Sequence, residues 1–326
     1  MRIRQVLQPV VAFFVSLLLF LVLLELTLQI YTRLFIYYDV EMSRYATEVK
    51  EKSDDPRIGH EHVPGATARL MGVDVVINSD GLRDAEYSVE RTGAYRIAVL
   101  GDSLTFGWGV EKQDSFEALL EQRLNELQPT EIINFGHGNY NTEQQVNLFK
   151  KKGLKYSPDK VVVFYFINDA EITPVRSRWT PLARLRSVTF LWSRVRGLLS
   201  RSNSGATFES FYADLYRDDQ PGLLALQQAF RELRDLCRRE GIELQVVLLP
   251  ELHDLVNYPF ADEYQKVSRF LAGEGISAMD LTPAFAGFED AEGLWVAADD
   301  AHPNELAHRM IADFVIDFVA EGQGEL

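Results

Sequence analysis

The chain has 326 residues and a formal net charge of −15, because 48 acidic residues outnumber 33 Lys and Arg residues. Its length allows one or two domains, and 47% hydrophobic with 25% charged residues is typical of a globular protein. An acidic chain lacks the positive field on which non-specific nucleic-acid binding depends, so we expect no nucleic-acid partner. Cys237 is the only cysteine, which excludes an intrachain disulfide and a cysteine-rich zinc site, and we expect neither a metal nor a cofactor.

The N-terminus predicts a membrane helix. The sixteen residues from Pro9 to Leu24 carry no charge, and only Glu25 interrupts the apolar character before Ile30. As a helix, residues 9–30 would measure roughly 33 Å, which is enough to cross a hydrocarbon core of about 30 Å. The alternative is a cleaved signal peptide, but the apolar region of such a peptide is shorter and is followed by small residues. The pattern therefore favours an uncleaved anchor.

The charges that flank this helix leave its orientation open. Arg2 and Arg4 favour a cytoplasmic N-terminus. Positive residues also follow the helix, however, and these are Arg33, Arg44 and Lys50. The excess of positive charge on the cytoplasmic side, which usually sets the orientation, does not decide it here.

Residues 31–93 follow the anchor, and most of them are polar. They include prolines, glycines and one β-like run at Val73–Ile77. We interpret them as a small membrane-proximal lead-in module and not as a second catalytic domain. The pattern changes at Tyr95, and we expect one α/β domain over residues 94–326.

From Tyr95 onward, predicted strands and helices alternate. Five short apolar runs have the length of buried strands: Ile97–Leu100, Ile132–Phe135, Val161–Phe166, Leu244–Leu249 and Ile276–Leu281. Apolar residues recur at helical spacing in three further segments, 116–127, 223–237 and 306–318. Strands separated by helices predict a parallel sheet with helices on both faces, and ligands bind such sheets at the carboxyl ends of the strands.

Chemically useful residues follow the ends of these predicted strands. Ser103 stands on a glycine-flanked turn after the first run, where a nucleophile can be presented. The second run leads into a glycine-containing loop, 136–142, whose backbone N–H groups can approach a ligand closely. Asn168 follows the third run, and near the C-terminus Asp299 precedes His302 by three residues. Together these segments supply a nucleophile, hydrogen-bond donors and a base.

The four segments resemble the blocks of the SGNH hydrolases, also called the GDSL esterase/lipase family. They occur in the family's order: Gly101-Asp102-Ser103-Leu104, Gly136–Thr142, Asn168-Asp169 and Asp299-x-x-His302. Each block alone is a weak signal, but all four in order are a strong one. The resemblance covers roughly residues 78–318, and the segment 78–83 looks like the lead-in of membrane-anchored bacterial members.

The resemblance implies a fold and a location. It implies a flavodoxin-like three-layer α/β/α sandwich with a five-stranded parallel sheet for residues 94–326. The membrane-anchored members imply a single-pass protein of the inner (cytoplasmic) membrane. Residues 1–8 would then lie in the cytoplasm, and the catalytic domain would face the periplasm or the cell exterior.

The resemblance also implies a role for each residue. Ser103 would be the nucleophile, with His302 as general base and Asp299 as the residue that orients the imidazole. The oxyanion hole would consist of the Ser103 N–H, the Asn139 N–H and the Asn168 side chain.

One of these donors departs from the family pattern, which usually has glycine where this chain has Asn139. Asparagine keeps the backbone N–H and tolerates left-handed backbone geometry better than most residues. Gly138 or Gly136 is the alternative donor if the loop is shifted.

The implied activity is hydrolysis of acyl esters through an acyl-enzyme, with an O-acetylated cell-envelope carbohydrate as the favoured substrate. Two alternatives stay open. An O-acyltransferase would pass the acyl group from the same serine to a surface glycan. A non-catalytic glycan-binding or assembly protein would keep only the fold, although the complete set of catalytic residues argues against it.

A basic segment at about 174–208 has no place in these blocks. It contains seven arginines and neither an acid nor a lysine. Apolar residues recur in it at near-helical spacing, which predicts a basic amphipathic helix or helix pair inserted into the domain. It could be a lid that attracts an anionic substrate, a surface that rests on anionic lipid, or a helix packed on the acidic body.

Three histidines stay without an assigned role. His60 and His62 resemble a metal-binding pair but lack further placed ligands. His137, in the loop of the second block, could contact either substrate or solvent.

Overall fold

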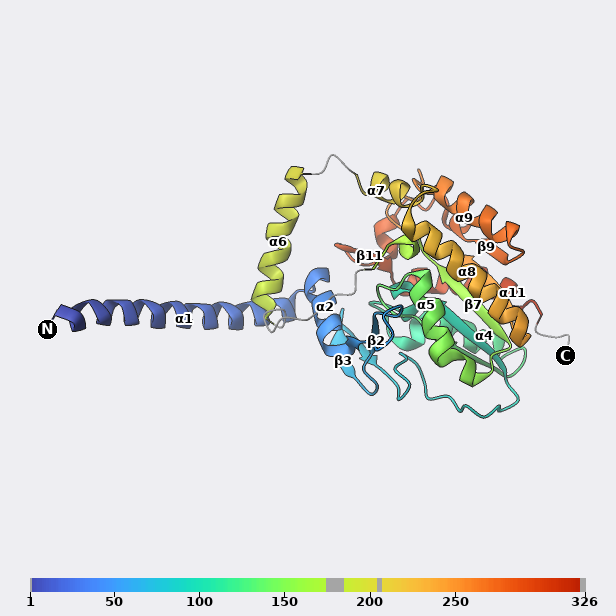
Figure 1. Cartoon of the computed structure of the whole chain (residues 1–326), viewed down its shortest axis with the longest axis horizontal. Coiled ribbons are helices and arrows are strands. Elements are labelled where there is room, and N and C mark those ends of the chain that lie inside the picture. The colour runs from blue at the N-terminus through green and yellow to red at the C-terminus, as the bar shows by residue number, and fades with distance from the viewer. Residues whose placement is uncertain (1, 174–184, 204–206, 323–326) are drawn as a thin grey trace. The chain divides into compact units, whose positions relative to one another are not determined.

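The computed structural model describes residues 2–173, 185–203 and 207–322 (Figure 1). The chain divides into two compact units, one formed by residues 1–47 and 176–204 and the other by 48–175 and 205–326. Residues 48–93, the lead-in segment below, therefore belong with the sheet and do not form the separate module that we expected over 31–93. The basic segment groups instead with the N-terminal helix.

The second unit is built on the five predicted strands, which form one parallel sheet and confirm the expected fold class. They are β5 (Tyr95–Gly101), β6 (Thr130–Asn134), β7 (Lys160–Tyr165), β8 (Glu243–Leu248) and β9 (Ser277–Asp280). Their order is β6-β5-β7-β8-β9, and every neighbouring pair is parallel. The chain changes direction across the sheet at β5, which lies between β6 and β7. A sheet of this kind binds its ligand at the carboxyl end of that strand.

Helices cover both faces of the sheet and complete the three layers. They are α4 (Phe116–Leu124) and α11 (Glu305–Ala320) on one face, and α5 (Thr142–Leu148), α8 (Pro221–Glu240) and α9 (Ala261–Gly273) on the other. Successive side chains of a strand point to opposite faces, so Val99 of β5 packs with α4 and α11 while Leu100 packs with α5, α8 and α9. Burial on both faces explains why the strands are continuous apolar runs in the sequence.

Shorter elements complete this unit. They are α3 (Ser103–Phe106), α7 (Phe208–Leu215), α10 (Thr282–Phe285) and the antiparallel hairpin of β10 (Trp295–Ala297) with β11 (Asp300–Pro303). The lead-in segment adds two antiparallel pairs, β1 (Lys50–Lys52) with β2 (His60–His62) and β3 (Thr67–Leu70) with β4 (Val73–Val76). The last strand is the predicted β-like run.

The lead-in segment is tied to the turn that follows β5. Buried Arg83 donates hydrogen bonds to the carbonyl oxygens of Phe106, Gly107 and Val110, at 3.0, 2.5 and 2.7 Å. These carbonyls lie at and just after the end of α3, where helical partners run out. The buried guanidinium thus supplies the donors that the end of this short helix lacks.

A stack of buried rings joins the lead-in segment to the loop after β6. The rings of His62 and His137 lie 3.8 Å apart with an angle of 14° between their planes, and Tyr140 stacks on the other side of His137 at 4.8 Å. All three residues are buried. Burial lowers the pKa of His137 to about 3 and holds the pKa of His62 well below its ordinary value, so both rings are neutral near pH 7.

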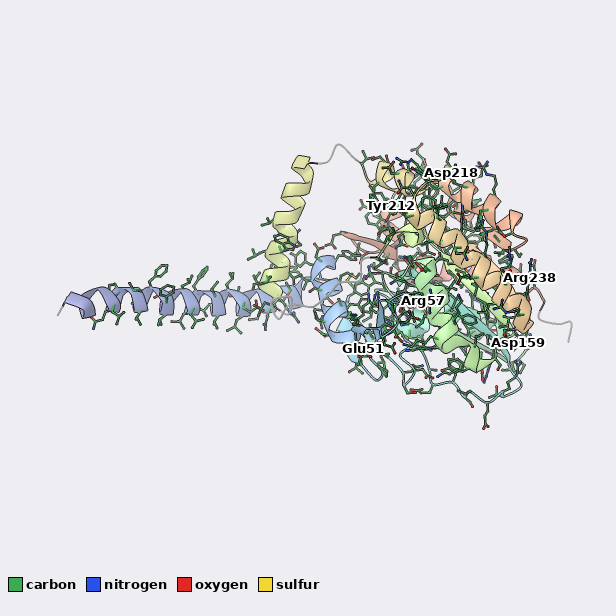
Figure 2. The ribbon with its side chains drawn as sticks, in the orientation of Figure 1. Glu51, Arg57, Asp159, Tyr212, Asp218 and Arg238 are labelled. Atoms are coloured by element: carbon green, nitrogen blue, oxygen red, sulfur yellow. The ribbon has the colours of Figure 1, made fainter. Side chains whose placement is uncertain are left out.

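The first unit contains α1 (Arg2–Leu34), α2 (Tyr38–Arg44) and α6 (Arg186–Asn203). Residues Leu7–Thr32 of α1 are long and apolar enough to cross a membrane, and side chains project outward on all sides of this helix (Figure 2). A signal sequence near an N-terminus can also form a helix that is long and apolar enough, so this feature alone does not make α1 an anchor. α6 is the helix predicted in the basic segment, of which residues 174–184 and 204–206 lie outside the described residues.

The histidine stack predicts how stability depends on pH. An unfolded histidine has a pKa of about 6.5, so His62 and His137 must be deprotonated for the chain to fold. Their contribution to the free energy of unfolding is fully present above that pH and is lost as the pH falls towards their lowered values in the folded state. We expect the unfolding temperature of the wild-type protein to fall between about pH 7 and pH 5. The unfolding temperature of the His62→Phe variant, which keeps a stacked ring, should fall less steeply over the same range.

Thermal unfolding followed by circular dichroism over this pH range checks the prediction. His253→Gln is the control, because the His253 ring donates a hydrogen bond to the Glu251 carboxylate, which raises the pKa of His253. The contribution of His253 to stability therefore depends on pH with the opposite sign. Identical slopes for wild type and His62→Phe would contradict it.

Candidate active site

Ser103 is presented by the turn between β5 and α3. Asp102 caps this short helix, because its Oδ1 accepts the N–H of Leu104 at 2.9 Å, a position in which Asp is strongly preferred. α3 ends at Gly107, whose φ of 77° lies in the left-handed region that glycine adopts readily. Ser103 is therefore the first helical residue after β5, the strand at which the chain changes direction across the sheet, and it is only 5% exposed.

The side chains of Ser103 and His302 meet although 199 positions separate them in the sequence. The Nε2 atom of His302 lies 2.8 Å from the Oγ atom of Ser103, a normal hydrogen-bond distance. His302 lies in β11, so the hairpin of β10 and β11 delivers the imidazole to the carboxyl end of β5. This is the geometry that a nucleophile and its general base require.

Asp300, and not Asp299, is the acid that contacts His302. The Nδ1 atom of His302 lies 2.5 Å from the Oδ1 atom of Asp300, and Asp300 is buried. Asp299 is exposed in the two-residue turn between β10 and β11, so the expectation that it orients the imidazole is wrong. Residues 300–303 form a strand, and in a strand the residues i and i+2 point to the same side. A spacing of three residues, which we expected for a turn, directs the Asp299 carboxylate away from the His302 ring.

A second partner holds the Asp300 carboxylate from the other side. The indole Nε1 of buried Trp108 donates a hydrogen bond to Asp300 Oδ2 at 2.8 Å. Burial by itself would raise the pKa of Asp300, but the hydrogen bonds from the His302 ring and from the Trp108 indole outweigh it and lower the pKa. Asp300 is therefore a carboxylate at neutral pH and fixes the proton of His302 on Nδ1.

The loop after β6 is held in place by its own polar residues. Asn141 caps α5 by accepting the N–H of Gln144, whose side chain in turn accepts the N–H of Asn141. Gly136 passes so close to α3 that an added Cβ would lie 2.4 Å from the backbone nitrogen of Phe106, and only glycine fits there. The loop therefore runs directly beside the turn that carries Ser103.

Asn139 adopts the left-handed conformation that its side chain tolerates, with a φ of 66°. Gly136, which we considered as an alternative donor, already donates its N–H to the side-chain oxygen of Asn134 at 2.7 Å. The carbonyl oxygen of Gly138, the other alternative, accepts hydrogen bonds from the lead-in segment. The occupied N–H of Gly136 favours Asn139 over Gly136 as the donor of this loop.

Asn168 lies beside the nucleophile turn, in the short 3-10 helix Ile167–Ala170 that follows β7. Its Nδ2 donates to Asp102 Oδ2 at 3.0 Å, and the same carboxylate oxygen lies 3.5 Å from Ser103 Oγ. Burial raises the pKa of Asp102, which serves the site by capping α3 and holding Asn168. The turns after β5 and β7 are thus joined by one hydrogen bond.

Asp169, the second residue of the same block, holds the two loops together. Its carboxylate accepts hydrogen bonds from Thr142 Oγ1 and from Gln145 Nε2, each at 3.0 Å. Burial, with the nearby charge of Asp102, raises its pKa well above the ordinary value. The block Asn168-Asp169 therefore combines one residue at the nucleophile with one that anchors the loop after β6.

The structure thus brings Ser103, His302 and Asn168 to one edge of the sheet and leaves Asp299 outside. Sequence reasoning missed two residues, Asp300 and Trp108. Asp300 could have been found from the alternation of side chains if residues 300–303 had been assigned to a strand. No local pattern in the sequence distinguishes Trp108, because its partner is 192 positions away.

A family model described as GDSL-like lipase/acylhydrolase matches residues 99–310, which is more than half of the chain and includes all four blocks. No curated protein matches the chain.

Several solved structures are similar to the chain. A putative lipolytic protein of the G-D-S-L family from Desulfitobacterium hafniense is 15% identical, with a TM-score of 0.45 over 68% of this chain and 98% of that one. The lipase/acylhydrolase from Enterococcus faecalis is 14% identical, with a TM-score of 0.43 over 69% and 94% of the two chains. An esterase from Pseudoalteromonas sp. is 16% identical, with a TM-score of 0.44 over 71% and 100%.

The matched residues, 99–310, begin within β5 and extend past His302, so they contain Ser103, Asn168, Asp300 and His302. The chain belongs to the GDSL-like lipase/acylhydrolase family and is a hydrolase of ester bonds.

Proposed function

We propose that this protein is a membrane-anchored serine esterase that removes short acyl groups, principally O-acetyl, from a cell-envelope carbohydrate. The observation that carries the proposal is the hydrogen-bonded chain from Ser103 Oγ through the His302 ring to the Asp300 carboxylate, with distances of 2.8 and 2.5 Å. This chain contains a nucleophile, a general base and the group that orients the base.

The reaction follows from this arrangement. His302 Nε2 takes the proton of Ser103 as Oγ attacks the ester carbonyl, and Asp300 stabilises the imidazolium that forms. The tetrahedral intermediate collapses, the C–O bond of the ester breaks, and the imidazolium returns its proton to the departing alcohol. Water then attacks the acyl-enzyme by the same steps, which releases the carboxylic acid and regenerates Ser103.

Three donors would stabilise the oxyanion. The Asn168 amide uses one N–H on Asp102 and keeps a second for the ligand. The N–H of Ser103 lies at the start of α3, and the left-handed turn at Asn139 supplies the third. Removing one such donor typically costs about 2.7–4 kcal/mol of transition-state stabilisation.

Two features favour a small acyl group and an envelope substrate. Ser103 is nearly buried among the described residues, which restricts the space for the acyl chain.

Within the first unit, Glu25 of α1 accepts hydrogen bonds from the backbone N–H groups of Arg186 and Ser187, at 3.1 and 3.0 Å. Cleavage of α1 as a signal peptide would remove this partner, so the contacts support an uncleaved anchor. We propose a single pass through the inner membrane, with the catalytic unit facing the periplasm.

Covalent labelling distinguishes an enzyme from a protein that only binds glycans. We expect a fluorophosphonate to label the wild-type protein, and we expect Ser103→Ala to abolish both labelling and hydrolysis of p-nitrophenyl acetate. His302→Ala should reduce both strongly, because the serine would lose its base. A folded wild-type protein that is not labelled would favour the binding protein instead.

A second comparison separates Asp300 from its neighbour. Asp300→Asn should lower kcat for p-nitrophenyl acetate by about 10³- to 10⁴-fold, since the imidazole loses the carboxylate that fixes its tautomer. Asp299→Asn, at the adjacent exposed position, should stay within about twofold of wild type, as surface substitutions usually do. Equal losses in the two variants would refute the assignment of Asp300.

Hydrolase and transferase differ only in the group that takes the acyl from Ser103. Release of acetate from an acetylated glycan can be measured with and without an unacetylated glycan acceptor. If the acceptor diverts most of the acyl product onto sugar, the protein is an O-acyltransferase and the proposal of hydrolysis is wrong.

A further inference from the structure

Helix α6 carries an apolar stripe that is exposed. Five side chains form it: Leu185, just before the helix, with Val188, Leu191, Trp192 and Val195. Trp192 is the most exposed of them, at 61%. A helix of a water-soluble protein normally turns such a stripe inward, so the outward stripe requires a non-aqueous neighbour.

The opposite side of α6 packs against the other helices of the first unit. Phe190 lies edge-on against Tyr37, with 5.4 Å between ring centroids, and the guanidinium of Arg194 lies over both rings. Thr189 Oγ1 lies 3.3 Å from Ser43 Oγ of α2. The polar and aromatic side of α6 is thus its docking side, and the apolar stripe points away from the unit.

The start of α6 is fixed to a definite level of α1. Glu25 accepts the first N–H groups of α6, where a carboxylate is favourable for the helix dipole. The Arg186 guanidinium also reaches Thr32 Oγ1 at 3.2 Å. Twenty uncharged residues separate Arg4 from Glu25. As a helix they measure about 30 Å, the thickness of the hydrocarbon core, so Glu25 marks the boundary with the headgroups.

We propose that α6 lies along the membrane surface, with its apolar stripe in the boundary between headgroups and acyl chains. Figure 1 shows α6 running across the axis of α1, the direction that a helix in the membrane plane takes beside a spanning helix. A basic helix with Trp and Leu on one face is typical of this environment. The seven arginines of the segment, without any acid, suit anionic headgroups. This inference rests on the anchor in the proposed function.

Depth measurements on the full chain in lipid nanodiscs test the proposal. In a Cys237→Ala background, which removes the only cysteine, spin labels are attached to Trp192→Cys, to Val15→Cys in α1 and to Leu224→Cys in α8. Leu224 is the matched control, because it is also an exposed apolar residue on a helix but belongs to the sheet unit. Accessibility to oxygen, which enriches in lipid, is compared with accessibility to a water-soluble nickel chelate, in bilayers with and without phosphatidylglycerol.

We expect the Trp192 label to be several-fold more accessible to oxygen than to nickel, with a greater depth in phosphatidylglycerol, and the Leu224 label to show the reverse. A Trp192 label that is as water-exposed as Leu224, or one protected from both reagents by protein, would overturn the proposal. The Val15 label separates the two ideas, because a water-exposed Val15 means that the anchor itself has failed.

A different observation concerns the proposed oxyanion donor. Two side chains of the lead-in segment bind the carbonyl oxygen of Gly138: Lys50 through Nζ at 2.6 Å and His60 through Nε2 at 3.1 Å. Because a carbonyl only accepts hydrogen bonds, the Nε2 atom of His60 must carry the proton. Lys50 Nζ also donates to the side-chain oxygen of Asn139 at 3.0 Å.

The Gly138 carbonyl and the Asn139 N–H belong to the same peptide group. In a planar trans peptide these two bonds point in opposite directions, so a fixed carbonyl also fixes the direction of the N–H. The positive charge of the Lys50 ammonium beside the Gly138 carbonyl oxygen further polarises the peptide group and makes its N–H a stronger donor. We infer that Lys50 and His60 are positioning residues for the Asn139 oxyanion donor, an inference that rests on the proposed esterase.

Steady-state kinetics test this role. Lys50→Met should lower kcat for p-nitrophenyl acetate about tenfold with little change in KM, because the lost interaction strengthens only as the oxyanion forms. Lys50→Arg should restore part of the activity. Lys52→Met is the matched control, since Lys52 lies in the same strand but is exposed.

Four outcomes are informative. Wild-type kcat in Lys50→Met, or an equal loss in Lys52→Met, would refute the positioning role. A raised KM with unchanged kcat would do so as well, since it would indicate a contact with substrate in the ground state. If Ser103→Ala keeps full activity, the proposed esterase fails first, and the two failures are therefore distinguishable.

Discussion

The hydrogen bond between Ser103 and His302 is the contact on which the proposed chemistry depends, and it requires two distant parts of the chain to meet within 2.8 Å. Ser103 comes from the end of β5, at the point where the strand order reverses. His302 comes from a separate two-stranded hairpin. A single hydrogen bond does not fix the hairpin to the end of β5. The other hydrogen bonds around the site therefore determine whether Ser103 and His302 stay in contact.

Three buried contacts supply this support, and each one links different elements. Trp108 follows α3 and holds Asp300 of the hairpin, Asp169 after β7 holds α5, and Arg83 of the lead-in segment holds the end of α3. Each joins a side chain to a partner that would otherwise be buried without a hydrogen bond, which makes its loss costly. Such a frame keeps catalytic groups within the small tolerances that they require.

The lead-in segment has a larger part in this frame than its composition suggested. Its histidines stack on the loop after β6, its arginine binds the turn after Ser103, and Lys50 binds the loop that contains Asn139. It is therefore part of the catalytic unit and not a spacer between membrane and enzyme. The first unit is held together differently. Polar groups join α6 to α1, while the apolar side chains of the stripe on α6 are exposed.

The sequence by itself determined the five strands, the helices within 116–127, 223–237 and 306–318, the apolar N-terminal helix and the position of Ser103 and Asn168 at one edge of the sheet. These follow from short-range patterns, since buried strands are apolar runs and the carboxyl ends of parallel strands share an edge. Only the tertiary structure decided which aspartate faces His302, because that depends on whether residues 300–303 form a strand or a turn. It also decided the contacts of Lys50, Arg83 and Trp108, whose partners lie far away in the sequence, and the outward direction of the apolar stripe on α6. Local patterns contain no information about such partners, since a side chain's neighbours across the fold are set by the packing of whole elements.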